Sequence, residues 1–158
     1  PNIRIILKWN ERDTDLDLHL VRSDSQFGDL EGDCHYANCR PSTNAYATSD
    51  LDWGVWGNDA DNPFLDVDDN EHAGPENIFW YGAEDGDYYI DIDYHPESTL
   101  NIDVLPDVEI WADGILVDWI FYDISQSPLR AGEIWRSAML RIRNGVVSVQ
   151  QIDSIRTN

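Results

Sequence analysis

The sequence predicts an all-β protein, an antiparallel β-sandwich of jelly-roll-like type, from three observations. Short segments in which apolar and polar residues alternate recur along the chain, as expected for strands with one buried face. Turn signals such as Asp-Gly and Asn-Gly separate several of these segments. No long stretch has the period of an amphipathic helix. Repeated short strands joined by turns indicate two antiparallel sheets packed together.

The expected strands can be followed from the N-terminus. The first is Ile3–Trp9, and the second is Asp15–Val21, in which carboxylates alternate with aliphatic side chains. After a long interruption, Glu76–Tyr81 leads into an acidic, glycine-containing turn at residues 84–87. Tyr88–Tyr94 then shows the cleanest alternation in the chain. The N-terminal half therefore supplies four strands around one long excursion.

The C-terminal part predicts two hairpins. Asp-Gly and Asn-Gly pairs are typical of the two-residue turns that join neighbouring antiparallel strands. The first turn is expected at Asp113-Gly114 and the second at Asn144-Gly145. The strands expected on either side of these turns are Val108–Trp111, Ile115–Phe121, Met139–Arg143 and Val146–Ile152.

The excursion spans residues 23 to 63 and contains both cysteines. A structureless loop of this length is rare inside a compact domain unless it has a function. A zinc site at Cys34 and Cys39 would need two further soft ligands; His35 is one candidate, but no second cysteine pair exists. A disulfide that pins the loop is the favoured interpretation, worth about 2 kcal/mol. It predicts an oxidising location: extracellular, cell-surface or periplasmic.

Composition limits the classes of function. A chain of 158 residues fits one domain, residues 1–158, with a core of its own. Its 31 Asp and Glu face 10 Lys and Arg, a formal net charge of −21, which excludes nucleic acid and disfavours anionic membranes. No hydrophobic segment predicts direct membrane insertion. Without a signal peptide or initiating Met, the chain is expected to be a mature or excised piece of a larger secreted or surface protein.

Two acidic signatures about fifty residues apart predict a metal site. One is Asp13-Thr14-Asp15-Leu16-Asp17-Leu18-His19, and the other is Leu65-Asp66-Val67-Asp68-Asp69 followed by Gly74-Pro75-Glu76-Asn77. On a strand, the period of two places the acids on one face, where they repel each other unless a cation lies among them. Ca²⁺ takes six to eight oxygen ligands. The expected calcium ligands are Asp15, Asp17, Asp66, Asp68, Asp69, Glu76 and Asn77.

Two neighbouring interpretations were weighed against this one. An EF-hand is rejected, because a loop starting at Asp66 has Glu71 where glycine is needed and Asn77 where the bidentate Glu is needed. His19 is expected to pack beside the site, since its oxygen-rich neighbours suit a hard cation. Adaptation to high salt could explain the acidity, as Lys8 is the sole lysine, but the concentration of Asp between Asp13 and Asp93 argues partly against it.

These motifs together resemble the YfaP-like family of bacterial secreted domains of unknown function. The resemblance covers residues 3–95 and weakens beyond them. A more distant likeness is to the tellurium-resistance stress-protein domains, which are β-sandwiches that bind calcium between two such segments. That likeness implies that the two signatures meet around one or two Ca²⁺ ions. The residues that carry the first resemblance are Trp9, Asp15, Asp17, Leu18, His19, Leu65, Asp66, Asp68, Asp69, Gly74, Pro75, Glu76, Asn77, Ile78, Gly86, Asp87 and Tyr88.

The sequence favours recognition over catalysis. Trp53 and Trp56 lie in the excursion and are candidates to stack against a ligand such as a sugar ring. No nucleophile elbow or phosphate-binding glycine loop is present, so the chain is expected not to be an enzyme. We expect a calcium-binding adhesion or accessory module that binds a glycan, a peptide or a surface protein. The alternatives are a structural spacer or capping module and a metal-dependent hydrolase.

Overall fold

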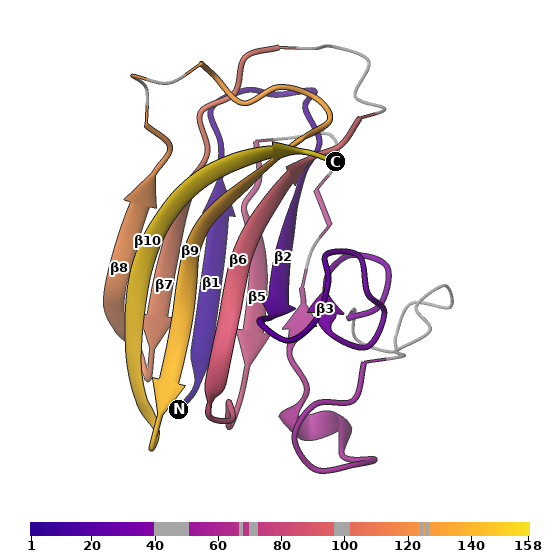
Figure 1. The fold of residues 1–158 in the computed structure, drawn as a ribbon, viewed down its shortest axis with the longest axis vertical. Coiled ribbons are helices and arrows are strands. Elements are labelled where there is room, and N and C mark those ends of the chain that lie inside the picture. The colour runs from indigo at the N-terminus through magenta and orange to yellow at the C-terminus, as the bar shows by residue number, and fades with distance from the viewer. Residues whose placement is uncertain (40–50, 67, 70–72, 97–101, 124, 126) are drawn as a thin grey trace.

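Two five-stranded antiparallel sheets pack face to face, which confirms the expected β-sandwich (Figure 1). The computed structural model describes residues 1–39, 51–66, 68–69, 73–96, 102–123, 125 and 127–158. The first sheet has the strand order β4-β5-β1-β7-β8, and the second has the order β10-β9-β6-β2-β3. The strands are β1 (Ile3–Lys8), β2 (Leu16–Arg22), β3 (Asp33–Cys34), β4 (Phe64–Leu65), β5 (Glu76–Trp80), β6 (Gly86–Tyr94), β7 (Asp107–Ala112), β8 (Ile115–Phe121), β9 (Glu133–Arg143) and β10 (Val146–Thr157), and a short 3₁₀ helix, η1, spans Asp59–Asp61.

The core lies between the sheets, where the aliphatic side chains of the alternating strands meet. On β2, Leu16, Leu18 and Leu20 are fully buried, and they pack in the same hydrophobic cluster as Ile5 and Leu7 of β1. Because strand side chains alternate between faces, Asp17 and His19 are placed on the opposite face of β2 from these leucines. The hydrophobic period thus fixes which face of β2 carries the polar side chains.

Both expected hairpins are present. The turn between β7 and β8 has φ of 49° at Asp113 and 80° at Gly114. The turn between β9 and β10 has φ of 50° at Asn144 and 73° at Gly145. Positive φ at both central residues is the signature of the type I′ turn, whose twist matches that of the flanking strands.

The last two strands are longer than the sequence indicates. β9 has 11 residues and β10 has 12, and their pairing is interrupted by a register shift between Gln151 and Ser154. A second shift lies in the pairing of β9 with β6, where Ile90 and Asp91 pair with Ala138 and Arg136, so that Ser137 of β9 is the extra residue. In β9 and β10 these irregularities move side chains out of the simple alternation, so the period of two breaks although each strand continues.

The chain between β2 and β5 adds two short strands that the sequence did not predict, β3 inside the excursion and β4 directly after it, and each covers an edge of a sheet. β3 pairs with Leu20 and Val21 of β2, and β4 pairs with β5. The predicted disulfide between Cys34 and Cys39 is confirmed, and the Leu65 N–H of β4 donates to the Cys39 carbonyl at 2.7 Å. The disulfide loop therefore connects an edge strand of one sheet to an edge strand of the other. Residues 40–50 of the excursion lie outside the described residues.

The Asn144-Gly145 turn gives a direct test of the hairpin. Gly145→Ala should lower the free energy of unfolding by about 1 kcal/mol, because a β-carbon at positive φ is strained. Urea unfolding followed by tryptophan fluorescence would measure the change. Ser148→Ala, at an exposed position of β10, is the control and should change stability by less than about 0.5 kcal/mol. Equal effects of the two substitutions would contradict the turn assignment.

Candidate metal centre

The two acidic signatures meet in the structure. Asp15 precedes β2, Asp17 lies on β2, and Asp68 lies in the segment between β4 and β5. One carboxylate oxygen from each of these three residues lies within 4.8 Å of the others. β3 pairs with β2 at Leu20 and Val21, so the Asp17 end of β2 is left for the β4–β5 segment. The sequence separation of about fifty residues is thus closed by the packing of the two sheets.

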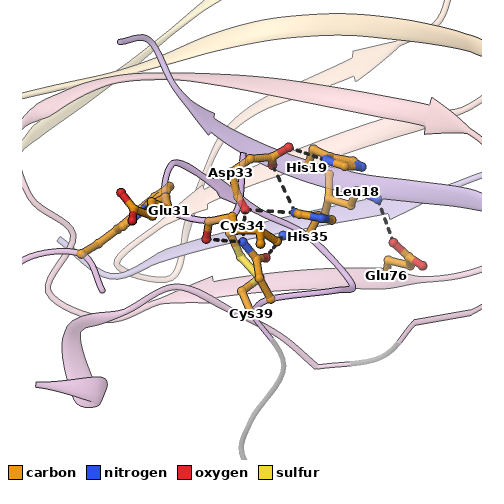
Figure 2. The surroundings of a disulfide bond; sticks show 11 residues. Leu18, His19, Glu31, Asp33, Cys34, His35, Cys39 and Glu76 are labelled. Atoms are coloured by element: carbon orange, nitrogen blue, oxygen red, sulfur yellow. Dashed lines mark hydrogen bonds and ion pairs between the residues drawn. A yellow bond between two sulfur atoms is a disulfide. The ribbon is translucent and has the colours of Figure 1, made fainter. Parts of the chain in front are cut away.

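Glu76 connects the two signatures through their backbones. It is 0% exposed, and its Oε2 accepts a hydrogen bond of 2.9 Å from the Leu18 N–H on β2. Figure 2 shows the carboxylate of Glu76 facing this amide. Its Oε1 accepts a hydrogen bond of 3.0 Å from the Asp69 N–H. One buried side chain of the first sheet therefore holds both a strand of the second sheet and the segment that carries Asp68.

Burial and neighbouring negative charges oppose ionisation of the carboxyl groups of Glu76 and Asp15. Burial and the neighbouring Asp17 raise the pKa of Glu76 well above its usual value, although its two backbone hydrogen bonds act in the other direction. Burial also raises the pKa of Asp15; the charge of His95 opposes this effect and that of Asp69 adds to it. Asp15 Oδ1 is buried and has no hydrogen-bond partner among the described residues. Ionised carboxylates at these positions are costly unless a positive charge lies among them.

The donor set fits a hard divalent cation. Carboxylate oxygens are the ligands that Ca²⁺ prefers, and the ion accepts irregular geometry with six to eight oxygens. Asp15, Asp17 and Asp68 offer the clustered oxygens, and Glu76 and Asp69 lie directly beside them. Five of the seven predicted ligands are therefore gathered in one place.

The other two predicted ligands lie elsewhere, which corrects the sequence interpretation. Asp66 is exposed and is not in the carboxylate cluster of the described residues. The Asn77 side chain accepts hydrogen bonds from Arg4, at 3.2 Å from Nε and 2.9 Å from Nη2. Neighbouring residues of β5 face opposite sides of the sheet, so Glu76 points between the sheets while Asn77 points outward.

The two tryptophans predicted to bind ligand have different surroundings. Trp53 is 1% exposed, and its ring packs on Trp80 and Tyr88 with centroid distances of 5.2 and 5.7 Å. Its indole N–H donates to the Glu31 carbonyl at 2.8 Å. Trp53 is therefore a core residue that anchors the excursion, and the expectation that it stacks on a ligand is corrected. Trp56 is 90% exposed and is accessible to a ligand.

No protein-family model matches the chain, and no curated protein matches it either. The resemblance to the YfaP-like family rests on the motifs in the sequence and stays a prediction.

The raised pKa values predict that the effect of calcium depends on pH. A carboxyl with a higher pKa in the folded state stabilises the fold below its unfolded-state pKa, near 4.5 for Glu76, and this contribution is lost as the pH rises through the folded-state pKa. A bound cation stabilises the ionised carboxylates and so offsets the loss. The difference in melting temperature between calcium and chelator should therefore be small near pH 4.5 and larger near pH 7. Scanning fluorimetry at each pH would measure it, and a difference that does not vary with pH would contradict this account.

Proposed function

We propose that the chain is a calcium-stabilised recognition module of a secreted or surface protein, with the ion held by Asp15, Asp17 and Asp68. The observation that carries the proposal is the approach of these three carboxylates to within 4.8 Å, from two segments that one buried Glu76 ties together. Glu76 and Asp69 complete the oxygen-rich surroundings.

The role proposed for the ion is structural. It supplies a positive charge among the clustered carboxylates, of which Asp17 is buried and Asp15 and Asp68 are half-buried, and it joins β2 to the segment between β4 and β5. Calcium is favoured over magnesium because Mg²⁺ demands a tight octahedral shell, whereas Ca²⁺ adapts to carboxylates fixed by the fold. Because the cluster lies where the two sheets meet, loss of the ion should loosen the contact between them.

The covalent chemistry supports an oxidising location. Disulfides such as Cys34–Cys39 persist outside the cytosol of most organisms. Within the described part of the chain, no helix has the length and apolar character needed to cross a membrane. We propose that the module works at the cell surface, in the periplasm or in the medium.

Calcium should stabilise the fold. At a free concentration of one hundred times Kd, binding to the native state adds about 2.7 kcal/mol, which corresponds to a rise in melting temperature of roughly 5 to 10 °C for a domain of this size. Millimolar magnesium should give much less. Asp17→Asn and Asp68→Asn should each remove most of the rise, as measured by differential scanning calorimetry in calcium and in chelator.

Asp118→Asn is the matched control for the calcium experiment. Asp118 lies on β8 of the first sheet, and its carboxylate accepts from the Trp119 N–H. This variant should keep the full calcium response. If the melting temperature of the wild-type protein is the same in calcium and in chelator, the proposal is overturned, and an acidic surface adapted to salt becomes the better explanation.

A second candidate function, glycan binding, is favoured by the outer face of the first sheet. Large aromatic side chains are exposed there: Tyr81 is 50% exposed, Trp119 45% and Phe121 59%. Phe64, Phe79 and Tyr81 form one cluster of rings, with centroid distances of 5.5 Å from Phe64 to Phe79, 6.4 Å from Phe79 to Tyr81 and 5.9 Å from Phe64 to Tyr81. Aromatic residues exposed together on one face mark a surface that binds something.

A cavity of about 360 Å³ on this face combines aromatic walls with polar groups. Phe79, Tyr81 and Trp111 line it together with Arg4 and Asn2. Arg4 and Phe79 lie opposite each other on β1 and β5, and the guanidinium sits 5.0 Å from the ring centroid. Ligand pockets are mostly apolar with a few polar groups that fix orientation. Sugar rings, with apolar C–H faces and hydroxyl rims, suit this combination, so we propose a glycan as the ligand.

Removal of the exposed rings tests the glycan proposal. Tyr81→Ala should weaken binding of any glycan captured by the calcium-loaded protein at least about tenfold, because a buried aromatic contact is worth more than 1 kcal/mol. A glycan array followed by calorimetry would measure it. Val146→Ala, at an exposed apolar position on β10 of the second sheet, is the control and should bind normally. Equal loss in both variants, or no captured glycan, would contradict binding at this face and leave the calcium proposal intact.

A further inference from the structure

A second group of metal-ligating side chains lies beside the carboxylate cluster, at the junction of β2 and β3. His19 is on β2, Asp33 is on β3, and His35 follows β3. All three are buried, with exposures of 3%, 0% and 6%, and they offer ligand atoms within 4.8 Å of one another. Of the two histidines, His19 belongs to the first acidic signature and His35 to the disulfide loop, and the calcium proposal uses neither of them.

The Nδ1 atoms of both histidines are held by Asp33. His19 Nδ1 lies 2.7 Å from Asp33 Oδ2, which also accepts the Gly28 N–H at 2.8 Å. His35 Nδ1 lies 3.0 Å from the Asp33 backbone carbonyl. A carbonyl oxygen can only accept, so Nδ1 of His35 carries the proton, and the carboxylate assigns the same role to Nδ1 of His19. In the neutral rings, Nε2 then carries the lone pair.

The two lone pairs face the same region. The imidazole rings are stacked with an interplanar angle of 9° and a centroid distance of 4.9 Å. Figure 2 shows them side by side, each with one nitrogen toward Asp33 and the other directed away from it. His19 Nε2 is buried and has no hydrogen-bond partner among the described residues. Phe27 stacks on His19 at 4.2 Å and shields that ring from water.

Several carboxylates lie near the His19 ring. Those of Asp33, Asp17 and Asp93 act on it electrostatically, and each is an anion that a bound cation would neutralise. Asp93 lies opposite Asp17 in the pairing of β6 with β2. Its Oδ1 is a further buried acceptor without a hydrogen-bond partner in the described part of the chain.

We propose that His19 and His35 bind a divalent transition-metal ion, with Zn²⁺ as the representative, through their Nε2 atoms, and that Asp33 positions both rings. Histidines that ligate metals typically donate their other ring N–H to a carboxylate or a backbone carbonyl, and Asp33 provides one of each. Imidazole nitrogen suits Zn²⁺, Cu²⁺ and Ni²⁺ but not Ca²⁺, so this site is chemically distinct from the carboxylate cluster.

The first test uses the wild-type protein with its calcium site saturated. Long-range ¹H–¹⁵N NMR of the imidazoles reports which nitrogen carries the proton and which binds metal. We expect both His19 and His35 to be protonated at Nδ1, and Zn²⁺ to shift both Nε2 signals at one equivalent. Signals of these two rings that do not respond to Zn²⁺ would overturn the proposal, as would a response that excess Ca²⁺ abolishes.

The second test uses variants of similar size, with Zn²⁺ affinity measured by calorimetry in millimolar calcium. His19→Gln and His35→Gln should each weaken binding at least about tenfold, and Asp33→Asn should weaken it by about ten- to a hundredfold, as expected for a positioning carboxylate. His95→Gln, outside the group, is the control and should bind normally. Far-ultraviolet circular dichroism identifies variants that fail to fold, and His35→Gln provides the decisive comparison if His19→Gln is one of them. Zn²⁺ affinity that survives both His19→Gln and His35→Gln, or that is lost in His95→Gln, would place the ion elsewhere.

Discussion

The buried carboxylate of Glu76 is the interaction on which the arrangement of the two sheets around the metal centre depends. It belongs to β5 of the first sheet, yet it accepts hydrogen bonds from the backbones of Leu18 on β2 and of Asp69 before β5. Both bonds satisfy amide groups at the point where strand pairing is incomplete. The same carboxylate lies close enough to Asp17 that the charge of Asp17 adds to burial in raising the pKa of Glu76. Structure and electrostatics at this point are therefore coupled, and a cation relieves the electrostatic cost while leaving the backbone bonds in place.

The segment between β2 and β5, which contains the excursion and β4, completes the sandwich at its edges. Exposed edge strands are prone to unwanted pairing, and natural proteins cover them with short strands or loops. Here β3 and β4 each contribute two residues to an edge, and the disulfide loop joins them. The same segment brings Asp33 and His35 against His19. The segment that covers the sheet edges therefore also brings the two histidines together beside the carboxylate cluster. Strand β2 contributes His19 to the first group and Asp17 to the second.

The regular strands could be predicted because their pattern is local. Alternation of aliphatic and polar residues identified β1, β2, β5 and β6, and the Asp-Gly and Asn-Gly pairs placed both hairpin turns. The two-residue strands β3 and β4 carry too few residues for any period to be recognised, and the full lengths of β9 and β10 were obscured by the register shift at Gln151–Ser154. Strand pairing there is decided by the neighbouring strand and not by the segment itself.

The sequence by itself determined which side chains share a face, because the strand period of two is a property of the backbone. It therefore placed Asp15 and Asp17 together. The disulfide between Cys34 and Cys39 was predicted for a different reason, because the sequence offers no second cysteine pair to complete a zinc site. What lies opposite each face was decided only by the tertiary structure. Packing of the sheets placed Glu76 beside Leu18 and turned Asn77 outward to Arg4. It also buried Trp53 in the core while leaving Trp56 exposed, and it brought Asp33 within hydrogen-bond distance of His19 and His35. These outcomes depend on contacts between segments far apart in the chain, which no local pattern encodes.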